Sequence, residues 1–176
     1  MFFIPGQVIA ALTFPGVIVH EFAHMIFCKI RGVAVLDACY FRIGNPAGYV
    51  IHERTTNFYS SFLIATGPFL VNSILCFLIC LPAYVPISVF DVTSPLSAAL
   101  MWLGVSIGMH AIPSTGDANN MWQDAKTHVR SLNPLAILTF PLVVVIYVFN
   151  VLRVIWADLG YGILIGVGLP SWIFGS

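Results

Sequence analysis

The chain has 176 residues, of which 59% are hydrophobic and only 8% carry a charged side chain. A soluble domain has about 25% charged residues, so this composition excludes a soluble globular enzyme and also a disordered chain. The seven basic and seven acidic residues cancel, which excludes a nucleic-acid-binding protein that depends on a basic surface. The composition is typical of an integral membrane protein, and we expect one membrane-embedded domain over residues 1–176.

Five apolar stretches are candidates for helices that cross a bilayer, which takes about 20 residues. The first covers about residues 7–30 and is interrupted by Pro15-Gly16. The next three cover about residues 58–81, 95–112 and 134–154. The last, residues 159–174, is short and rich in glycine, and is either a spanning helix or a re-entrant or interfacial segment. The sequence therefore predicts an all-α polytopic membrane protein with four or five transmembrane helices.

Two features interrupt this helical pattern. Residues 33–57 contain Asn45-Pro46 and Gly48 between pieces of high β-propensity. This pattern predicts a β-hairpin or looped sheet at the membrane face. Pro82 and Pro86 are expected to end the second helix, because proline cannot continue the hydrogen-bond ladder.

The basic residues predict the orientation of the chain in the membrane. Six of the seven lie in two predicted loops, which follow the first and the third helix: Lys29, Arg31, Arg42, Arg54, Lys126 and Arg130. Arg153 stands apart, near the far end of the fourth helix. The positive-inside rule assigns both loops to the cytoplasm, so we expect the N-terminus outside.

His20-Glu21-Phe22-Ala23-His24 is the part of the sequence that indicates chemistry most directly. Residues four apart lie on one face of a helix, so both imidazoles can point at one metal ion. Glu21 then lies beside that ion and can accept a proton from a bound water molecule, as in zinc metalloproteases. Because ionisable residues are costly inside a membrane helix, we expect a Zn²⁺ site here rather than a metal-free polar cluster.

A catalytic zinc site has three protein ligands and one open position for water. The predicted topology brings the turn that ends at Asp117 to the cytoplasmic end of the third helix, the same end as His20 and His24. We therefore expect Asp117 to be the third ligand and the site to face the cytoplasm. The other candidates are His110, His52 and Cys28, of which His110 could instead support a ligand or stabilise an oxyanion.

Gly67-Pro68 and Asn72 form a second motif, inside the second predicted helix. A Gly-Pro pair opens the helix backbone and lets a neighbouring helix approach closely. A buried amide such as that of Asn72 needs a hydrogen-bond partner. Near the metal it would polarise a scissile carbonyl or hold the substrate backbone, and elsewhere it would join two helices.

Together these residues resemble the site-2 protease family of intramembrane zinc metalloproteases. His20 to His24 resemble its HExxH helix, Gly67-Pro68 with Asn72 is similar to its Gly-Pro-x-x-x-Asn motif, and Pro113 to Asp117 resemble its turn with the aspartate ligand. Gly48-Tyr49-Val50 is similar to a strand of that family, and the likeness covers about residues 15–120. In this sequence Gly116 precedes Asp117, whereas the family usually has Asp-Gly.

The resemblance implies an intramembrane zinc endopeptidase that cleaves transmembrane or membrane-associated protein segments in the lipid bilayer. Glu21 would be the general base, His20, His24 and Asp117 the Zn²⁺ ligands, and Asn72 and His110 the groups that contact substrate or oxyanion. Gly48, Tyr49 and Val50 would hold the substrate as an extended strand. The alternatives are a zinc-binding membrane protein without proteolytic activity and a metal transporter. The oligomeric state stays open.

Overall fold

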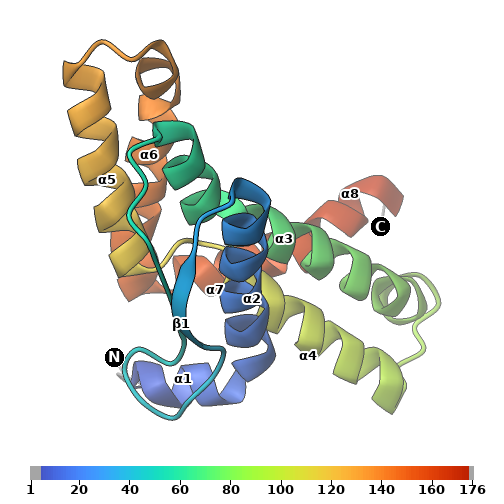
Figure 1. The fold of residues 1–176 in the computed structure, drawn as a ribbon. Coiled ribbons are helices and arrows are strands. Elements are labelled where there is room, and N and C mark those ends of the chain that lie inside the picture. The colour runs from blue at the N-terminus through green and yellow to red at the C-terminus, as the bar shows by residue number, and fades with distance from the viewer. Residues whose placement is uncertain (1–4, 175–176) are drawn as a thin grey trace.

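The computed structural model describes residues 5–174, and most of them are helical (Figure 1). The helices in chain order are α1 (Gly6–Leu12), α2 (Phe14–Arg31), α3 (Phe58–Tyr84), α4 (Pro95–Met109), α5 (Thr115–Arg130), α6 (Pro134–Val151), α7 (Ala157–Ile163) and α8 (Leu169–Phe174). Short π-helical or 3-10 segments extend α3, α6 and α7: Val85–Val89, Leu152–Ile155 and Leu164–Gly168. The prediction of a mainly helical chain is confirmed.

Three helical stretches of the described chain are long and apolar enough to cross a membrane: Phe58–Val89, Pro134–Ile155 and Ala157–Phe174. A fourth is added if α1 and α2 count as one broken span. The α4 helix is apolar but has only 15 residues, because it ends at Met109 rather than at residue 112. These helices are compatible with a multi-pass membrane protein.

The first predicted helix is two helices that meet at an angle of 88°. The break lies at Thr13, whose hydroxyl donates to the Ile9 carbonyl at 2.7 Å and so helps to close the end of α1. Pro15 does not interrupt α2 but lies in its first turn, where its missing N–H leaves no intrahelical bond unmade.

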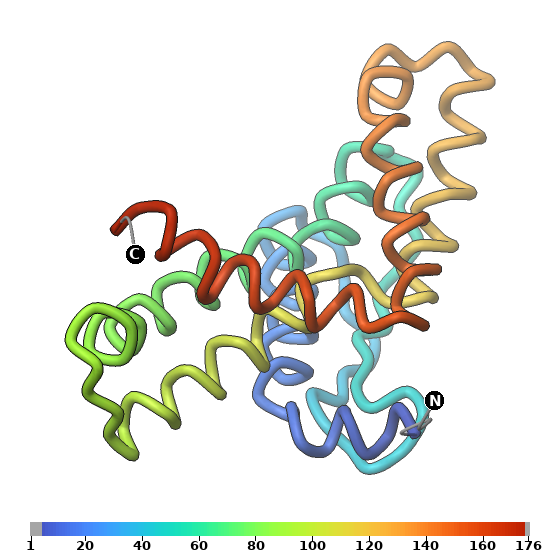
Figure 2. Tube along the Cα trace, turned by 180° about the vertical axis from the view of Figure 1, so that it is seen from behind, coloured from blue at the N-terminus to red at the C-terminus, as the bar shows by residue number. Residues whose placement is uncertain are grey.

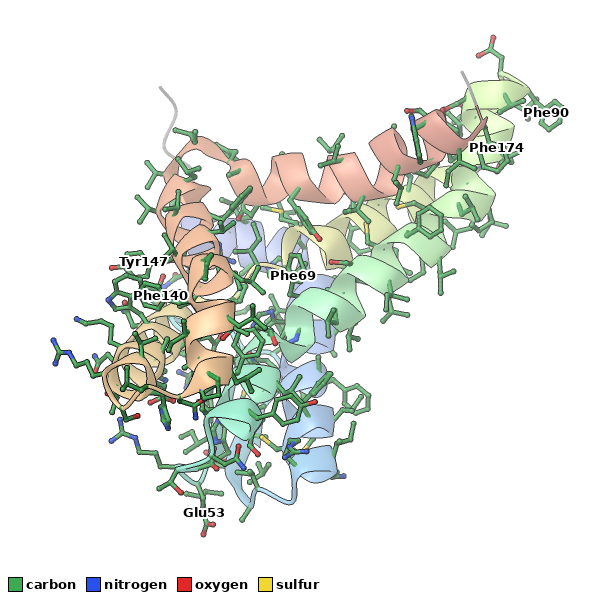
Figure 3. All side chains as sticks on the ribbon, turned by 90° about the horizontal axis from the view of Figure 1, so that it is seen from above. Glu53, Phe69, Phe90, Phe140, Tyr147 and Phe174 are labelled. Carbon is green, nitrogen blue, oxygen red and sulfur yellow. The ribbon has the colours of Figure 1, made fainter. Side chains whose placement is uncertain are left out.

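The expectation that Pro82 ends the second helix was wrong. The α3 helix continues through Pro82 to Tyr84, and the π-helical segment that follows contains Pro86. Neighbouring helices and local π-helical adjustments let apolar helices accommodate proline, since they restore the backbone contacts that its ring displaces. Packing against α4 and the C-terminal helices supplies such neighbours (Figure 3).

The predicted hairpin between residues 33 and 57 is confirmed. Strands β1 (Val35–Cys39) and β2 (Tyr49–His52) pair antiparallel, with Ala38 opposite Val50 and Cys39 opposite Tyr49. The hairpin lies beside α2, which contacts both of its strands (Figure 1).

The α5 helix is an element that the sequence analysis did not predict. Ser114 caps it with a reciprocal capping box to Asp117, which satisfies backbone donors at the start of the helix. The helix is amphipathic, and its apolar residues Met121 and Ala125 pack against Ala136 and Val143 of α6. The α5–α6 pair forms an antiparallel hairpin that returns the chain to the start of α5 (Figures 1 and 2).

Candidate metal centre

Helix α2 places His20 and His24 one above the other on successive turns. Their Nε2 atoms are 3.3 Å apart, and both residues are only 6% exposed. Close packing at Gly16 positions this part of α2, because a β-carbon there would collide with the Ser106 carbonyl oxygen of α4. The two imidazoles therefore lie in the interior, where α2 meets α3 and α4.

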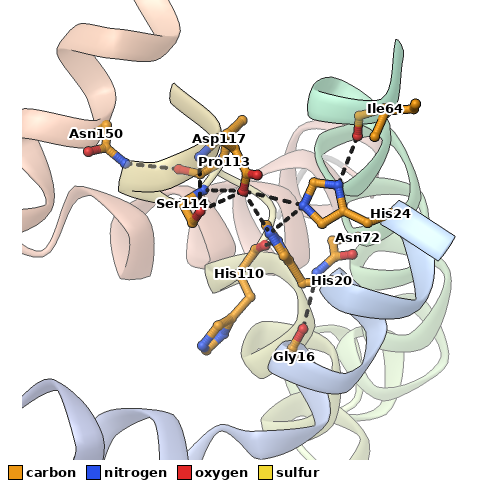
Figure 4. Close-up of polar contacts among 10 residues, drawn as sticks. All are labelled: Gly16, His20, His24, Ile64, Asn72, His110, Pro113, Ser114, Asp117 and Asn150. Atoms are coloured by element: carbon orange, nitrogen blue, oxygen red, sulfur yellow. Dashed lines mark hydrogen bonds and ion pairs between the residues drawn. The ribbon is translucent and has the colours of Figure 1, made fainter. Parts of the chain in front are cut away.

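The Nδ1 atom of each ring is paired with a backbone carbonyl (Figure 4). His20 Nδ1 lies 2.6 Å from the carbonyl oxygen of His110, and His24 Nδ1 lies 2.9 Å from that of Ile64. A carbonyl can only accept, so each Nδ1 carries the donated proton and each neutral ring presents an Nε2 lone pair. Metal-bound histidines are usually oriented by this kind of contact.

Asp117 completes a group of three possible ligands in the described part of the chain. Its Oδ2 atom is 3.3 Å from His24 Nε2 and 3.6 Å from His20 Nε2. The Ser114 backbone N–H and hydroxyl donate to the same oxygen at 3.1 and 2.6 Å, and so fix the carboxylate in the first turn of α5. The structure thus brings together the three ligands that the sequence predicted.

The donor set fits a divalent cation. One atom from each of the three side chains lies within 4.8 Å of the others, and with Nδ1 protonated on both rings all three atoms are acceptors. Three converging lone pairs repel one another unless a cation or additional protons lie between them. Two imidazoles and one carboxylate are typical ligands of zinc. When the imidazoles carry additional protons instead, burial still raises the pKa of Asp117, but the charges of His24 and His20 outweigh it and hold this pKa well below its usual range.

Glu21 lies beside the ligands and faces the hairpin. It is 9% exposed and lines the same cavity as His20 and His24. Gly48 packs against its side chain, because a β-carbon at position 48 would lie 2.7 Å from Glu21 Cγ. The structure therefore places Glu21 and Gly48 in one site, although 27 positions separate them in the sequence.

Two cavities adjoin this group, one lined by all three of its residues and the other by Asp117 but not the histidines. The cavity that contains Glu21 has a volume of about 470 Å³ and is also lined by Gly48, Tyr49 and Val50. The other measures about 460 Å³ and lies between β2, α3 and α5. Val50 and Asp117 line both cavities, so strand β2 runs past the ligands with open space on each side.

Asn72 and His110 are placed differently from the ligands. Asn72 is fully buried, and its amide donates to the carbonyls of Gly16 and Ile107, so it joins α3 to α2 and α4. This is the interhelical contact that the sequence analysis gave as the alternative role. The His110 ring points away from Asp117 (Figure 4), and it is the backbone carbonyl of His110 that holds His20.

The other candidates for a third ligand lie outside the group. Cys28 is fully buried one turn after His24, but it is not part of the group of possible ligands found in residues 5–174. His52 lies in β2 and lines the second cavity, where its Nδ1 pairs with the Glu53 carbonyl.

Three residues that support or line the site were missed by the sequence analysis. Ser114 was detectable, because the Ser-x-x-Asp spacing is typical of a capping box. Asn150 donates to the Pro113 carbonyl at 2.9 Å and accepts from Thr115 at 3.2 Å, so α6 holds the turn before Asp117 (Figure 4). Arg153 lines the cavity that contains Glu21, and its position depends on the path of α5 and α6.

The geometry defines a group of three possible metal ligands beside the Glu21 carboxylate, with both histidines buried and Asp117 partly exposed, in a mainly helical chain. Comparisons of the chain with protein-family models, with curated proteins and with solved structures find no match. The case for a function comes from the residues of the site themselves.

Proposed function

We propose that the protein is an intramembrane zinc endopeptidase. The observation that carries the proposal is the convergence of His20 Nε2, His24 Nε2 and Asp117 Oδ2, with Glu21 lining the same cavity. Without a metal ion, the same three atoms would need an additional proton on one of the imidazoles to avoid facing one another as acceptors. A metal ion accounts for this arrangement and for the paired Nδ1 atoms.

Each residue has a role in this proposal. Zinc held by these three ligands would supply an activated water molecule as the nucleophile. Glu21 accepts the proton of that water and passes it to the nitrogen of the leaving amine. The carbonyls of His110 and Ile64 keep the imidazoles in the required tautomer.

The substrate would be a transmembrane or membrane-associated protein segment in an extended conformation. A helix hides its carbonyls in the hydrogen-bond ladder, so the segment must unwind before it is cut. Strand β2 offers an edge along which an extended chain can pair, and the cavities on both sides of Val50 provide room for it. We infer a protein with four or five spans whose two basic loops lie in the cytoplasm and whose N-terminus lies outside.

The test compares the purified wild-type protein with Glu21→Gln, and uses Glu53→Gln at an exposed position as the matched control. Each protein is reconstituted with detergent-extracted membrane proteins, new N-termini are identified by mass spectrometry, and bound zinc is measured by elemental analysis. We expect cleavage by the wild type and Glu53→Gln, none by Glu21→Gln, and equal zinc in all three.

Other outcomes support the alternatives. New N-termini that are the same with Glu21→Gln would exclude the proposed role of Glu21. Zinc binding without any cleavage would favour a non-proteolytic zinc protein. Zinc flux into liposomes that Glu21→Gln weakens would favour a transporter, in which intramembrane ionisable residues line the ion path.

A further inference from the structure

We propose that Arg153 is a substrate-recognition residue, which binds a carboxylate of the substrate in the cavity beside the three ligands. The inference rests on the proposed function, because it names the class of substrate that the same site would select. The feature it predicts is a preference for segments with an acidic group near the bond that is cut.

Arg153 reaches the cavity from the C-terminal end of the α6 stretch. It lies in the 3-10 segment Leu152–Ile155, one turn after Asn150, which is hydrogen-bonded to the turn before Asp117. The cavity is lined by Arg153 together with His110, Thr115 and Asp117. The contacts of Asn150 that support the proposed third ligand therefore also hold the segment that carries Arg153 beside it.

The hydrogen-bonding capacity of Arg153 is largely unused. Its Nε atom is buried and has no hydrogen-bond partner among the described residues. The nearest carboxylate oxygen is Asp158 Oδ2 at 3.7 Å, which makes an ion pair but is too far for a hydrogen bond. A guanidinium has five N–H donors in a planar fork that matches a carboxylate, so a bound carboxylate would satisfy groups that Asp158 leaves open.

Arg153 supplies the positive charge at its end of the cavity. The cavity's other charged lining residues are Glu21 and Asp117, and the proposed chemistry uses both. Arg153 is the only lysine or arginine among the residues that line it. Its side chain is 28% exposed, so it combines partial burial with access from the cavity, and partial burial strengthens an ion pair relative to water.

The carboxylate could come from an Asp or Glu side chain or from the C-terminus of the substrate. The test uses three fluorescein-labelled peptides of one apolar sequence: one with a central Asp and an amidated end, one with Asn and an amidated end, and one with Asn and a free C-terminus. Binding to detergent-solubilised Glu21→Gln protein is measured by fluorescence anisotropy, so that no peptide is cut during the measurement.

We expect at least one carboxylate peptide to bind about 10-fold more tightly than the Asn amide, because hydrogen bonds to charged groups are stronger than those between neutral groups. The additional change Arg153→Gln should reduce this ratio to about 1, whereas Arg153→Lys should retain part of it. Arg130→Gln, at an exposed position of α5, is the control and should leave the ratio unchanged.

The peptide that keeps the preference identifies the source of the carboxylate. Equal binding of all three peptides to the Glu21→Gln protein, in which Arg153 is unchanged, would overturn the inference. A preference for carboxylate peptides that persists after the additional change Arg153→Gln would overturn it as well. If Arg153→Gln does not fold, Arg153→Lys decides, because an unchanged ratio there excludes recognition by the guanidinium fork. If the wild-type protein prefers carboxylate peptides but cleaves no protein, the proposed protease activity is refuted and recognition by Arg153 is retained. If it cleaves proteins but shows no preference for carboxylate peptides, recognition by Arg153 is refuted and the protease activity is retained.

Discussion

Gly48 of the hairpin lies directly against the side chain of Glu21 in α2. A β-carbon at position 48 would lie 2.7 Å from Glu21 Cγ and 3.1 Å from the carbonyl oxygens of Cys39 and Tyr40. The backbone on that side cannot give way without distorting the hairpin, so the carboxylate side chain would have to move. The hairpin thus sets the position of the proposed general base.

The change Gly48→Ala should therefore impair catalysis without removing the metal. A displacement of a reacting group by about 1 Å can cost about 100-fold in rate, so we expect kcat to fall by about that factor. Zinc content should equal that of the wild type, because the three atoms nearest to a β-carbon at position 48 belong to Glu21, Cys39 and Tyr40 and not to a proposed ligand. Turnover of a cleaved segment and elemental analysis on the same preparation measure both quantities.

Gly44→Ala is the matched control for that change. A β-carbon at position 44 would meet only the Arg42 side chain, at 3.6 Å, which is ordinary van der Waals contact. It should leave kcat within about twofold of the wild type, since surface substitutions away from special features usually change little. If kcat falls as much with Gly44→Ala as with Gly48→Ala, any change in the hairpin impairs catalysis, and displacement of Glu21 is not the cause.

Asp117→Ala should remove most of the bound zinc. The two histidines alone cannot complete a three-ligand site, so elemental analysis should find zinc close to one equivalent in the wild type and little in Asp117→Ala or His20→Ala. Asp124→Ala, on the same helix but lining the other cavity, should keep its zinc. Stoichiometric zinc in Asp117→Ala would move the third ligand to another residue, with His110 and Cys28 the first to examine.

Asn150→Ala tests the support of Asp117 by α6. It removes hydrogen bonds to the Pro113 carbonyl and to the Thr115 hydroxyl, and so frees the turn before Asp117. Loss of a group that orients metal ligands typically lowers metal affinity about 10–100-fold. We expect zinc affinity to fall about 10-fold, as measured by competition with a chelator of known affinity. An unchanged zinc Kd would show that Ser114 alone holds the carboxylate.

Asn72→Ala separates the structural role of this amide from a catalytic one. The amide joins α3 to Gly16 of α2 and to Ile107 of α4. Side-chain hydrogen bonds between membrane helices contribute about 0.6 kcal/mol on average, so two such bonds should lower the thermal midpoint by a few degrees. A kcat that falls about 100-fold at an unchanged midpoint would instead support a contact with the oxyanion.

The proposed metal ligands differ in how far the sequence could predict them. His20 and His24 are four apart on one helix, so their common face follows from helix geometry alone. Asp117 was predictable as a carboxylate at the same end of the molecule, but its distance to the rings depends on how α4 ends and α5 begins. The α5 helix escaped prediction because it is polar and not long enough to span, and only its capping box marks its start.

The roles of Asn72 and Arg153 could not be predicted, for two physical reasons. Asn72 is buried by the packing of three helices, and its partners are backbone carbonyls, which every residue has. Arg153 is 36 positions from Asp117, and the two line one cavity only because the α5–α6 hairpin reverses the chain. Pro82 stayed inside α3 for a related reason, since packing against neighbouring helices outweighed its local preference.

The return of α6 to the start of α5 gives the last quarter of the chain a part in building the centre. A shortened protein that stops before Pro134 would retain His20, Glu21, His24 and Asp117, yet it would lack the amide of Asn150 and the guanidinium of Arg153. It would also expose the apolar face of α5 that Ala136 and Val143 now cover. The smallest working unit therefore extends well beyond the segment that bears the four motif side chains.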